Sequence, residues 1–198
     1  MELQLTIEQV KALLVIAPKS DVRYYLNGAL LEVRDDRAWL VATDGHRMLV
    51  IRPTARIEGN DCRDGQYVIP RDLLAGAEVK KGGFLFLSVD QYQGENSARA
   101  RIITGTGEIA MPTVDAKFPD WRRVVPRDAS GAWAHYDPAY VGDFGAIAEL
   151  ISGARINARI HPNGSDAAPV DLGTDEALGL LMPIRAENFP YARPDWAA

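Results

Sequence analysis

One turn in the first quarter of the 198-residue chain gathers side chains that could carry out chemistry. Asp44 and His46 lie two residues apart in the segment TDGHR, and Arg47 follows them directly. A histidine oriented by a carboxylate could act as a general base if a nucleophile such as Cys62 or a serine lay nearby. However, the sequence around this turn contains neither a nucleophile motif nor a glycine-rich oxyanion loop. A hydrolase is therefore a weak interpretation.

Other patterns that could bind a metal or a cofactor are equally weak. His46, His135 and His161 do not have the spacing of metal ligands, and an isolated histidine usually lies at the surface or is hydrogen-bonded. The single cysteine, Cys62, cannot form an intrachain disulfide and argues against a zinc cluster. The segment 105–107, Gly-Thr-Gly, is a turn rather than a phosphate loop, because neither a lysine nor a helix follows it. The sequence therefore predicts a non-enzymatic protein without catalytic residues, metal or cofactor.

The composition is that of a soluble globular protein, with 47% hydrophobic and 25% charged residues. No apolar run approaches the length of a membrane span, and the N-terminus lacks the features of a signal peptide, so we expect a cytoplasmic protein. The net charge of −5 argues against indiscriminate binding to nucleic acid, although a local basic surface is compatible with it.

The elements that position the turn read as strand, helix and then three strands, which we call unit one (about 1–55). Thr6 and Gln9 can form a capping box at the start of the helix. The opening strand is predicted at 2–5. After the helix, alternating apolar residues at 22–26 predict a strand, and a second apolar run follows the Asn27-Gly28 step at 29–33. The later strands of the unit are predicted at 39–42 and 48–51.

The same order recurs twice. In unit two (66–114), a strand at 67–69 leads into a helix from Pro70 to about Val79, and the three strands that follow are predicted at 84–89, 98–104 and 108–113. Unit three (132–186) begins with a strand at 132–136, and its helix starts at Asp137 and ends at Gly153. Three strands follow, the first at 156–160. Residues 115–131 form a connector, and residues 187–198 an irregular tail.

Three separated segments carry a family resemblance. YYLNG at 24–28, followed by VATDGHRMLV at 41–50, resembles the middle domain of the bacterial sliding clamp, the beta subunit of DNA polymerase III. FPDWRRVVP at 118–126 resembles the clamp segment that joins its middle and last domains, and LLMPIR at 180–185 resembles the extreme C-terminus of the clamp. The matches occur in the order of the family, which makes the set more specific than any one of them.

The resemblance implies an α+β protein with the DNA-clamp fold, built from repeated strand-helix-three-strand units. Units one and two would form one clamp-like domain at 1–114, and unit three half a domain at 132–186. The bacterial clamp has three domains of two units each, and this chain resembles only the third, fourth and sixth units.

The resemblance also implies a pocket for a peptide between the middle and last domains. Its residues would be Leu26, Thr43, Gly45, His46, Arg47, Met48, Pro119, Arg123, Val124, Leu180, Met182, Pro183, Ile184 and Arg185. Their chemistry supports this independently, because the aliphatic side chains and prolines can form an apolar cleft in which methionines adapt to different ligands. The arginines, His46 and Thr43 can supply polar contacts at the rim.

In the family, helices present positive charge to the DNA backbone, and this predicts a weak DNA-facing set: Lys11, Lys19, Arg71, Lys80 and Lys81. The predicted helices of units one and two each carry a formal charge of only +1. The helix of unit three carries Asp137, Asp143 and Glu149 and no basic residue. This is a poor lining for DNA.

We therefore expect a clamp-like processivity factor, or a related replication or repair protein, that binds linear motifs of polymerase-type partners and a clamp loader. It would encircle double-stranded DNA, without sequence specificity, as a homo-oligomer. Because unit three has no partner unit in its own chain, two copies would pair their third units, and two such dimers would form a tetrameric ring. The alternative is a clamp mimic that competes for clamp-binding partners without forming a ring. An enzyme on a borrowed scaffold is a weaker third interpretation.

Overall fold

The computed structural model describes residues 2–53, 64–91, 98–154, 157–185, 193–194 and 196. Cys62 and most of the predicted tail lie outside these residues. Within this part of the chain, no helix is both long enough and apolar enough to cross a membrane.

Unit one has the predicted order, and its elements are β1 (Glu2–Thr6), α1 (Ile7–Ile16), the 3-10 helix η1 (Tyr24–Leu26), β2 (Gly28–Arg34), β3 (Arg37–Thr43) and β4 (Arg47–Ile51). The capping box is confirmed, because the Gln9 amide donates to the Thr6 hydroxyl and the Thr6 amide donates to the Gln9 side chain. The strand predicted at 22–26 is wrong. Val22 is 99% exposed, so the alternation there reflects no buried face, and the chain turns in η1 before β2 begins.

Unit two contains β5 (Gly65–Pro70), α2 (Arg71–Ala75), β6 (Phe84–Gln91), β7 (Ala98–Thr104) and β8 (Gly107–Pro112). The strands are confirmed, but the predicted helix is too long. It ends at Gly76, whose amide donates to the Asp72 carbonyl, and only Leu73 and Leu74 of the helix are buried. Beyond Gly76 the chain is irregular, with Ala77 and Val79 packed at the margin of the core, and a turn at 81–82 leads into β6.

Unit three contains α3 (Pro138–Ser152), β9 (Arg159–Ile160), β10 (Ala168–Asp171) and β11 (Ala177–Leu181). The predicted helix limits are confirmed: the Asp137 side chain accepts from the Ala139 amide, and Gly153 ends the helix with a left-handed backbone at φ 69°. The strand predicted at 132–136 is wrong as a strand of this chain. It forms only a single bridge, between His135 and Ile184.

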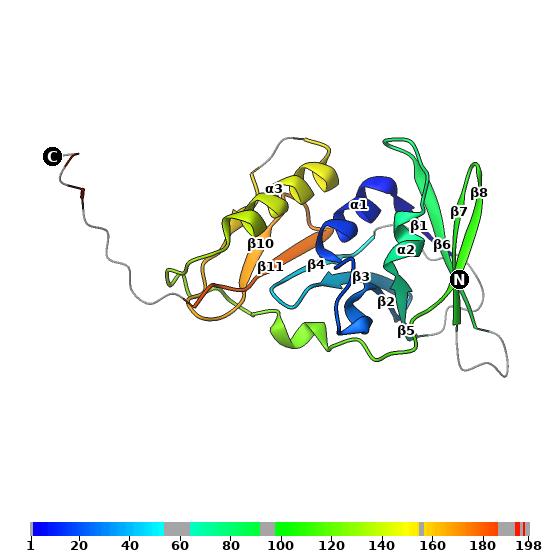
Figure 1. Cartoon of the computed structure of the whole chain (residues 1–198), viewed down its shortest axis with the longest axis horizontal. Coiled ribbons are helices and arrows are strands. Elements are labelled where there is room, and N and C mark those ends of the chain that lie inside the picture. Colours follow the sequence, from blue (N-terminus) through cyan, green and yellow to red (C-terminus); the bar gives the residue numbers. More distant parts are fainter. Residues whose placement is uncertain are drawn as a thin grey trace.

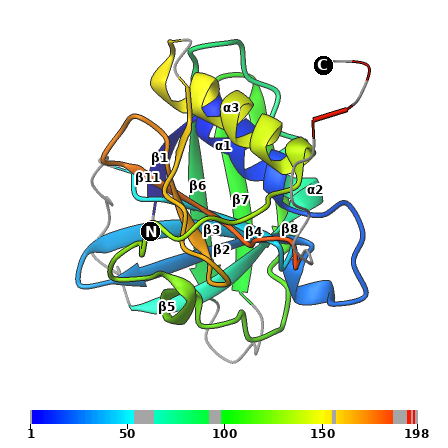
Figure 2. The ribbon, with the colours of Figure 1, turned by 90° about the vertical axis from the view of Figure 1, so that its left-hand side faces the viewer.

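The strands form two sheets, and the units exchange strands between them (Figures 1 and 2). The four-stranded sheet has the order β1-β6-β7-β8, so unit one donates its first strand to unit two. The seven-stranded sheet has the order β5-β2-β3-β4-β11-β10-β9, so unit two donates its first strand to unit one. All pairs are antiparallel.

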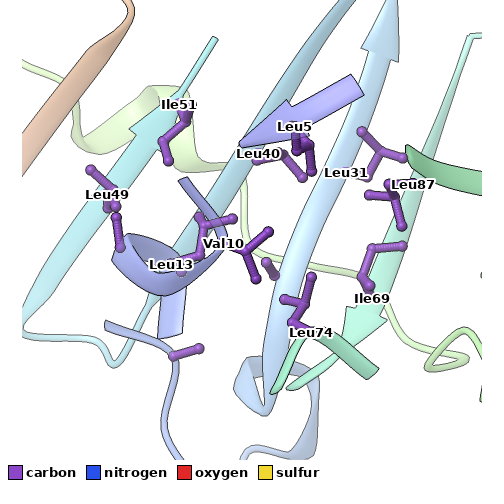
Figure 3. Close-up of a cluster of buried hydrophobic side chains, with 14 of the residues drawn as sticks. Leu5, Val10, Leu13, Leu31, Leu40, Leu49, Ile51, Ile69, Leu74 and Leu87 are labelled. Atoms are coloured by element: carbon purple, nitrogen blue, oxygen red, sulfur yellow. The ribbon is translucent and has the colours of Figure 1, made fainter. Parts of the chain in front are cut away.

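The larger of two apolar clusters among the described residues lies between the two sheets and the helices. Figure 3 shows Val10 and Leu13 of α1 above leucine and isoleucine side chains from β2, β3 and β4, with Leu87 and Ile69 beside them. Leu5 and Val10, which flank the first turn of α1, are both buried, as a hydrophobic staple requires. Burial of these side chains is the main favourable contribution to folding.

Unit three is joined to unit one through its last strand, β11. The expectation that unit three lacks a partner in its own chain is therefore wrong for this edge of the unit. β11 pairs with β4 from Ala177 opposite Ile51 to Leu181 opposite Arg47. α3 lies beside α1, and its buried Phe144 belongs to the same core (Figure 2). A Cβ at Gly179 would lie 2.6 Å from the Phe144 ring, so glycine lets α3 approach β11. Pairing between residues this far apart leaves no periodic signal in the sequence.

The connector crosses the face of the seven-stranded sheet that lies opposite the helices (Figure 2). Its 3-10 helix η2 (Trp121–Val124) is anchored to Glu32 of β2, which is 6% exposed. The Trp121 indole donates to Glu32 Oε2 at 2.8 Å, and Arg122 donates to the same oxygen at 2.6 Å. The Arg122 guanidinium lies 4.9 Å and 4.1 Å from the ring centroids of Trp39 and Trp121. The charge of Glu32 is therefore neutralised in place.

Burial alone would raise the pKa of Glu32, but the hydrogen bonds from Arg122 and Trp121 outweigh it, and the pKa is lowered. We predict that Glu32→Gln lowers the free energy of unfolding by about 1–2 kcal/mol at neutral pH, because a charged hydrogen bond is lost. A lowered folded-state pKa stabilises above the ordinary glutamate pKa, and this stabilisation is lost as the pH falls through the folded value. Denaturant unfolding should therefore show a difference that shrinks in acid.

The matched control is Glu78→Gln, which removes the same charge from an exposed position. It should leave the unfolding midpoint unchanged. Equal effects of the two substitutions would contradict an anchoring role for Glu32.

Candidate functional site

A cavity of about 200 Å³ opens between unit one, the connector and unit three, on the sheet face away from the helices. Ten of the fourteen residues predicted for the pocket line it: Leu26, Thr43, Gly45, His46, Arg47, Met48, Pro119, Val124, Leu180 and Met182. Leu26, Met48 and Leu180 are buried and belong to the apolar cluster beneath the cavity. Val124 is 50% exposed and Met182 40% exposed. The cavity therefore has an apolar base and an adaptable rim.

The turn between β3 and β4 forms one wall of the cavity, and its own side chains hold its shape. Thr43 Oγ1 donates to the Arg47 carbonyl at 2.8 Å and accepts from the Gly45 amide. Asp44 Oδ1 accepts from the backbone amides of His46 and Arg47 at 2.9 and 3.0 Å. The Asp44 carboxylate thus fixes the backbone and the Arg47 side chain, and these bonds orient the turn rather than the imidazole of His46.

Gly45 is required at the tip of this turn for two reasons. Its φ of 89° is in the region that favours glycine, and a Cβ there would lie 2.6 Å from Arg23 Nη1. Arg23 lines the cavity and donates to the Asp44 carbonyl at 2.9 Å. It also binds Asp21, and the hydrogen bond from Arg23 lowers the pKa of Asp21 to about 2. Arg23 stands beside the YYLNG segment, so the resemblance could have indicated it.

Arg47 connects the turn to unit three. Its side chain is 11% exposed and pairs with Asp44 at 2.9 Å and with Asp143 of α3. Its guanidinium lies 4.4 Å from the ring centroid of Tyr140, one helical turn before Asp143. Burial alone would lower the pKa of Arg47, but these two carboxylates outweigh it and raise the pKa. The cation is therefore compensated within the chain, and the wall stays in place without a ligand.

The connector supplies the opposite wall, and part of it was missed in the sequence. Besides Arg23, the lining residues absent from the prediction are Tyr25, Phe118, Asp120, Trp121 and Ala167. Phe118 and Trp121 are buried against the sheet and hold Pro119 and Val124 over the cavity. Both lie in the segment FPDWRRVVP, so the signal was present. Ala167 precedes β10, outside the quoted segments, and nothing in the sequence indicated it.

Four predicted pocket residues do not line the cavity: Arg123, Pro183, Ile184 and Arg185. Arg123, Ile184 and Arg185 are exposed, and Pro183 is half-buried. The Met182 amide still donates to the His46 carbonyl, but beyond it the chain leaves β4, and the Ile184 amide donates to the His135 carbonyl. These residues therefore flank the rim instead of the interior.

The arrangement favours binding over catalysis. The Asp44 carboxylate is engaged by backbone amides and Arg47, and the His46 ring lies 6.2 Å from the Tyr140 ring. Among the described residues, no group of three histidine, cysteine or acidic side chains is placed to hold a metal ion. An apolar cavity with compensated charges at its rim is suited to a ligand that offers apolar side chains.

The predicted DNA-facing residues lie on α1 and α2 or beyond their ends, but not all of them are free to contact DNA. Arg71 donates to the carbonyls of Ala17 and Leu14 at 3.0 and 3.1 Å and so holds the end of α1. Part of its guanidinium is therefore not available to contact a phosphate. Lys80 and Lys81 are exposed but lie in the turn after α2, not on a helix as predicted. Lys11 of α1 is exposed, as is Lys19 beyond its end.

Comparison with known proteins identifies the family of the chain. Residues 1–120 match the family described as DNA polymerase III beta subunit, central domain. The beta sliding clamp of Pseudomonas putida is 35% identical over 137 residues, which cover 68% of this chain and 33% of that clamp. The beta sliding clamp of Escherichia coli is 36% identical over 109 residues, covering 54% of this chain and 28% of that clamp. The chain thus spans about one third of the length of these relatives.

Solved structures show the same fold over more of the chain. The Pseudomonas aeruginosa DNA polymerase sliding clamp, determined with a ligand, gives a TM-score of 0.71 at 21% identity and covers 94% of this chain and 66% of that clamp. The Bacillus subtilis sliding clamp gives a TM-score of 0.70 at 14% identity, covering 94% and 65%. With the α+β clamp fold and the central-domain match over residues 1–120, the chain belongs to the family of the DNA polymerase III beta subunit.

Proposed function

We propose that this protein is a non-enzymatic, sliding-clamp-like processivity factor, or a related replication or repair protein, that binds linear peptide motifs of polymerase-type partners. One observation supports this most strongly. Three segments far apart in the sequence, around Leu26 to Met48, Pro119 to Val124 and Leu180 to Met182, converge on one apolar cavity. The role implies a cytoplasmic location and no cofactor.

The cavity limits the ligand. Its volume of about 200 Å³ is below that of a typical drug-sized site of about 300–1,000 Å³, so it would take a few side chains of a longer ligand. Arg23 and Arg47 are already paired with carboxylates. An acidic anchor would therefore gain little inside, whereas leucine and phenylalanine anchors bury apolar surface. An extended peptide, with a polar residue such as glutamine at the rim, meets these conditions.

The proposed oligomer is a ring around double-stranded DNA, in which four chains of three units would supply as many units as the two chains of the bacterial clamp. The alternative function is a clamp mimic that competes for the same partners without a ring. The acidic α3 and the engagement of Arg71 by α1 favour this alternative, because both weaken a basic lining.

We predict that a peptide with a glutamine and spaced leucine and phenylalanine anchors binds with micromolar affinity, about −8 kcal/mol. Met182→Glu should weaken binding by at least about tenfold, because the new charge would have to be desolvated against the ligand. Isothermal titration calorimetry measures both values.

The matched control for this titration is Met111→Glu, since Met111 is similarly exposed at 37% but lies on β8, outside the cavity lining. It should bind the peptide like the wild type. If the wild type shows no binding, the pocket assignment fails. Equal loss in both variants would locate the ligand elsewhere.

We predict that Asp143→Asn lowers the peptide affinity roughly threefold to tenfold although Asp143 does not line the cavity. The reason is that Arg47 loses its anchor on α3, and the wall formed by the turn loses its tie to unit three. Asp143→Glu, which keeps the charge, should restore most of the affinity. Glu149→Gln, an exposed position on the same helix, should have no effect. An equal loss for Asn and Glu at 143 would argue against positioning by charge.

We predict that binding to short linear duplex DNA is weak and falls further as salt is added, since few basic side chains are free to neutralise phosphates. Fluorescence anisotropy at increasing salt should show a shallow slope of log affinity against log salt, corresponding to only a few ion contacts. Tight binding at physiological salt would contradict this and would direct attention to the arginines of the connector.

A further inference from the structure

The complete pair of units in this chain shows how two units close each other. Each first strand pairs with the other unit's second strand: Thr6 lies opposite Phe84 in the β1–β6 pair, and Pro70 lies opposite Gly28 in the β5–β2 pair. In both cases the residue just before a helix faces the first residue of the receiving strand. α1 and α2 pack against each other at the same junction.

Unit three has the same parts but lacks this exchange. β9, its second strand, lies at the end of the seven-stranded sheet, with no further strand beyond it among the described residues. Its leading segment, residues 132–136, makes the single bridge between His135 and Ile184. Figure 1 shows α3 and β10 at one end of the molecule and β8 at the other. Unit three is therefore joined to unit one at β11 but has an open side at β9.

The leading segment is already placed as a donor strand. In unit two, Val68 of β5 bridges Val114, which follows the last strand of that unit, while β5 pairs with β2 of unit one. In unit three, His135 makes the equivalent bridge to Ile184, which follows β11. Val68 and His135 each stand two residues before the last residue that precedes their helix. On the other edge, the Ala132 carbonyl accepts from the Gly164 amide of the same chain, and the rest of the segment, up to Tyr136, is left for a receiving strand.

The side chains on this open side suit a receiving partner. Tyr136 and Ile160 are half-buried and pack at the border of the core, as do Leu150 and Ile151. On its outward face, α3 has no side chain at Gly142, and a Cβ added there would meet nothing within 4 Å. Another helix could therefore approach α3 closely at this position. These are apolar groups at the margin of a core that the described residues do not close on this side.

We propose that unit three binds a second copy of this chain, and that each copy adds its segment 132–136 to β9 of the other. The rule of the complete pair then sets the register, with Asp137 opposite Arg159 and Tyr136 opposite Ile160. This register places Tyr136 and Ile160 on the core side, where the corresponding pairs Leu5–Leu85 and Ile69–Ala29 are buried. Asp137 of each copy then faces Arg159 of the other. Because the contact is two-fold, the dimer would contain two such salt bridges.

The charges favour this pairing. Arg159 is 79% exposed and lies 3.8 Å from Asp171, so its charge is only weakly engaged. Asp143 on α3 is already compensated by Arg47, which leaves Glu149 as the acidic side chain that two apposed α3 helices would bring together. The opposite-charge pair at the strand edge offsets this repulsion.

The pairing specifies the homo-oligomer of the proposed function and rests on it. The two sites are separate, because the cavity lies between units one and three while the interface lies on the far side of unit three. Peptide binding and self-association can therefore be measured independently.

The test is light scattering of the full-length chain over micromolar concentrations. The wild type should have at least twice the 21.7 kDa mass of one chain: twice for the pair alone, and four times where two pairs close a ring. Arg159→Glu should weaken the dimer by about tenfold, because two like-charge cross-strand pairs replace two attractive ones. Arg34→Glu is the matched control, as Arg34 is also an exposed arginine on a strand, 3.6 Å from a carboxylate. It should leave the dimer intact.

Hydrogen exchange gives a second readout. In the wild type, residues 157–162 should exchange more slowly at high protein concentration than at low, and Arg159→Glu should remove this difference. A monomer at all concentrations, or equal behaviour of the two arginine variants, would overturn the proposal. If Arg159→Glu is monomeric but still binds the peptide, the loss of pairing is separate from the peptide site, and the proposed function stands. A dimer that binds no peptide would instead refute the proposed function.

Discussion

The backbone pairing of β4 with β11 is the interaction on which the rest of the structure depends. It joins residues more than one hundred positions apart in the chain into one seven-stranded sheet. On one face this sheet supports α1 and α3 over the common core, and on the other it forms the base of the cavity. Because both strands contribute to that base, through Met48 and Leu180, the cavity cannot form in either unit alone.

Charge compensation allows an apolar cavity at such a junction. Arg47 lies where β4 meets unit three, and an unpaired cation with this little exposure would be costly. Asp44 and Asp143 supply the countercharges from the two sides of the junction, and Tyr140 covers the guanidinium. The same residues that join the units therefore keep the rim rigid. Such pre-organisation reduces the entropy that a ligand would have to lose on binding.

Local signals in the sequence predicted most of the helices and strands. They did not predict features that depend on pairing between distant residues, such as the β4–β11 pair. Thr6 with Gln9 and Asp137 with Gly153 set the helix ends correctly, because capping involves neighbouring residues. The alternating pattern at 22–26 wrongly predicted a strand. Such a pattern indicates a strand only when one face is buried, and Val22 is exposed. Ten residues implied by the resemblance line the cavity. Pro183, Ile184 and Arg185 were implied as well but do not line it, because only the fold determines where the chain leaves β4.

The repeated units explain how assembly can be hierarchical. In the part of the chain that the structure describes, β9 on unit three and β8 on unit two are end strands of their sheets. A two-fold contact at β9 uses the same edge on both copies and cannot extend further, so a ring needs a second contact, and β8 lies at the opposite end of the molecule (Figure 1). That edge is exposed along its length, with Ile109 and Met111 partly open to solvent, but Pro112 lacks an amide hydrogen at one end. Even so, the six residues of β8 present more backbone groups than the two residues of β9. A contact at β8 would therefore rest on main-chain pairing, whereas the contact at β9 depends more on its side chains.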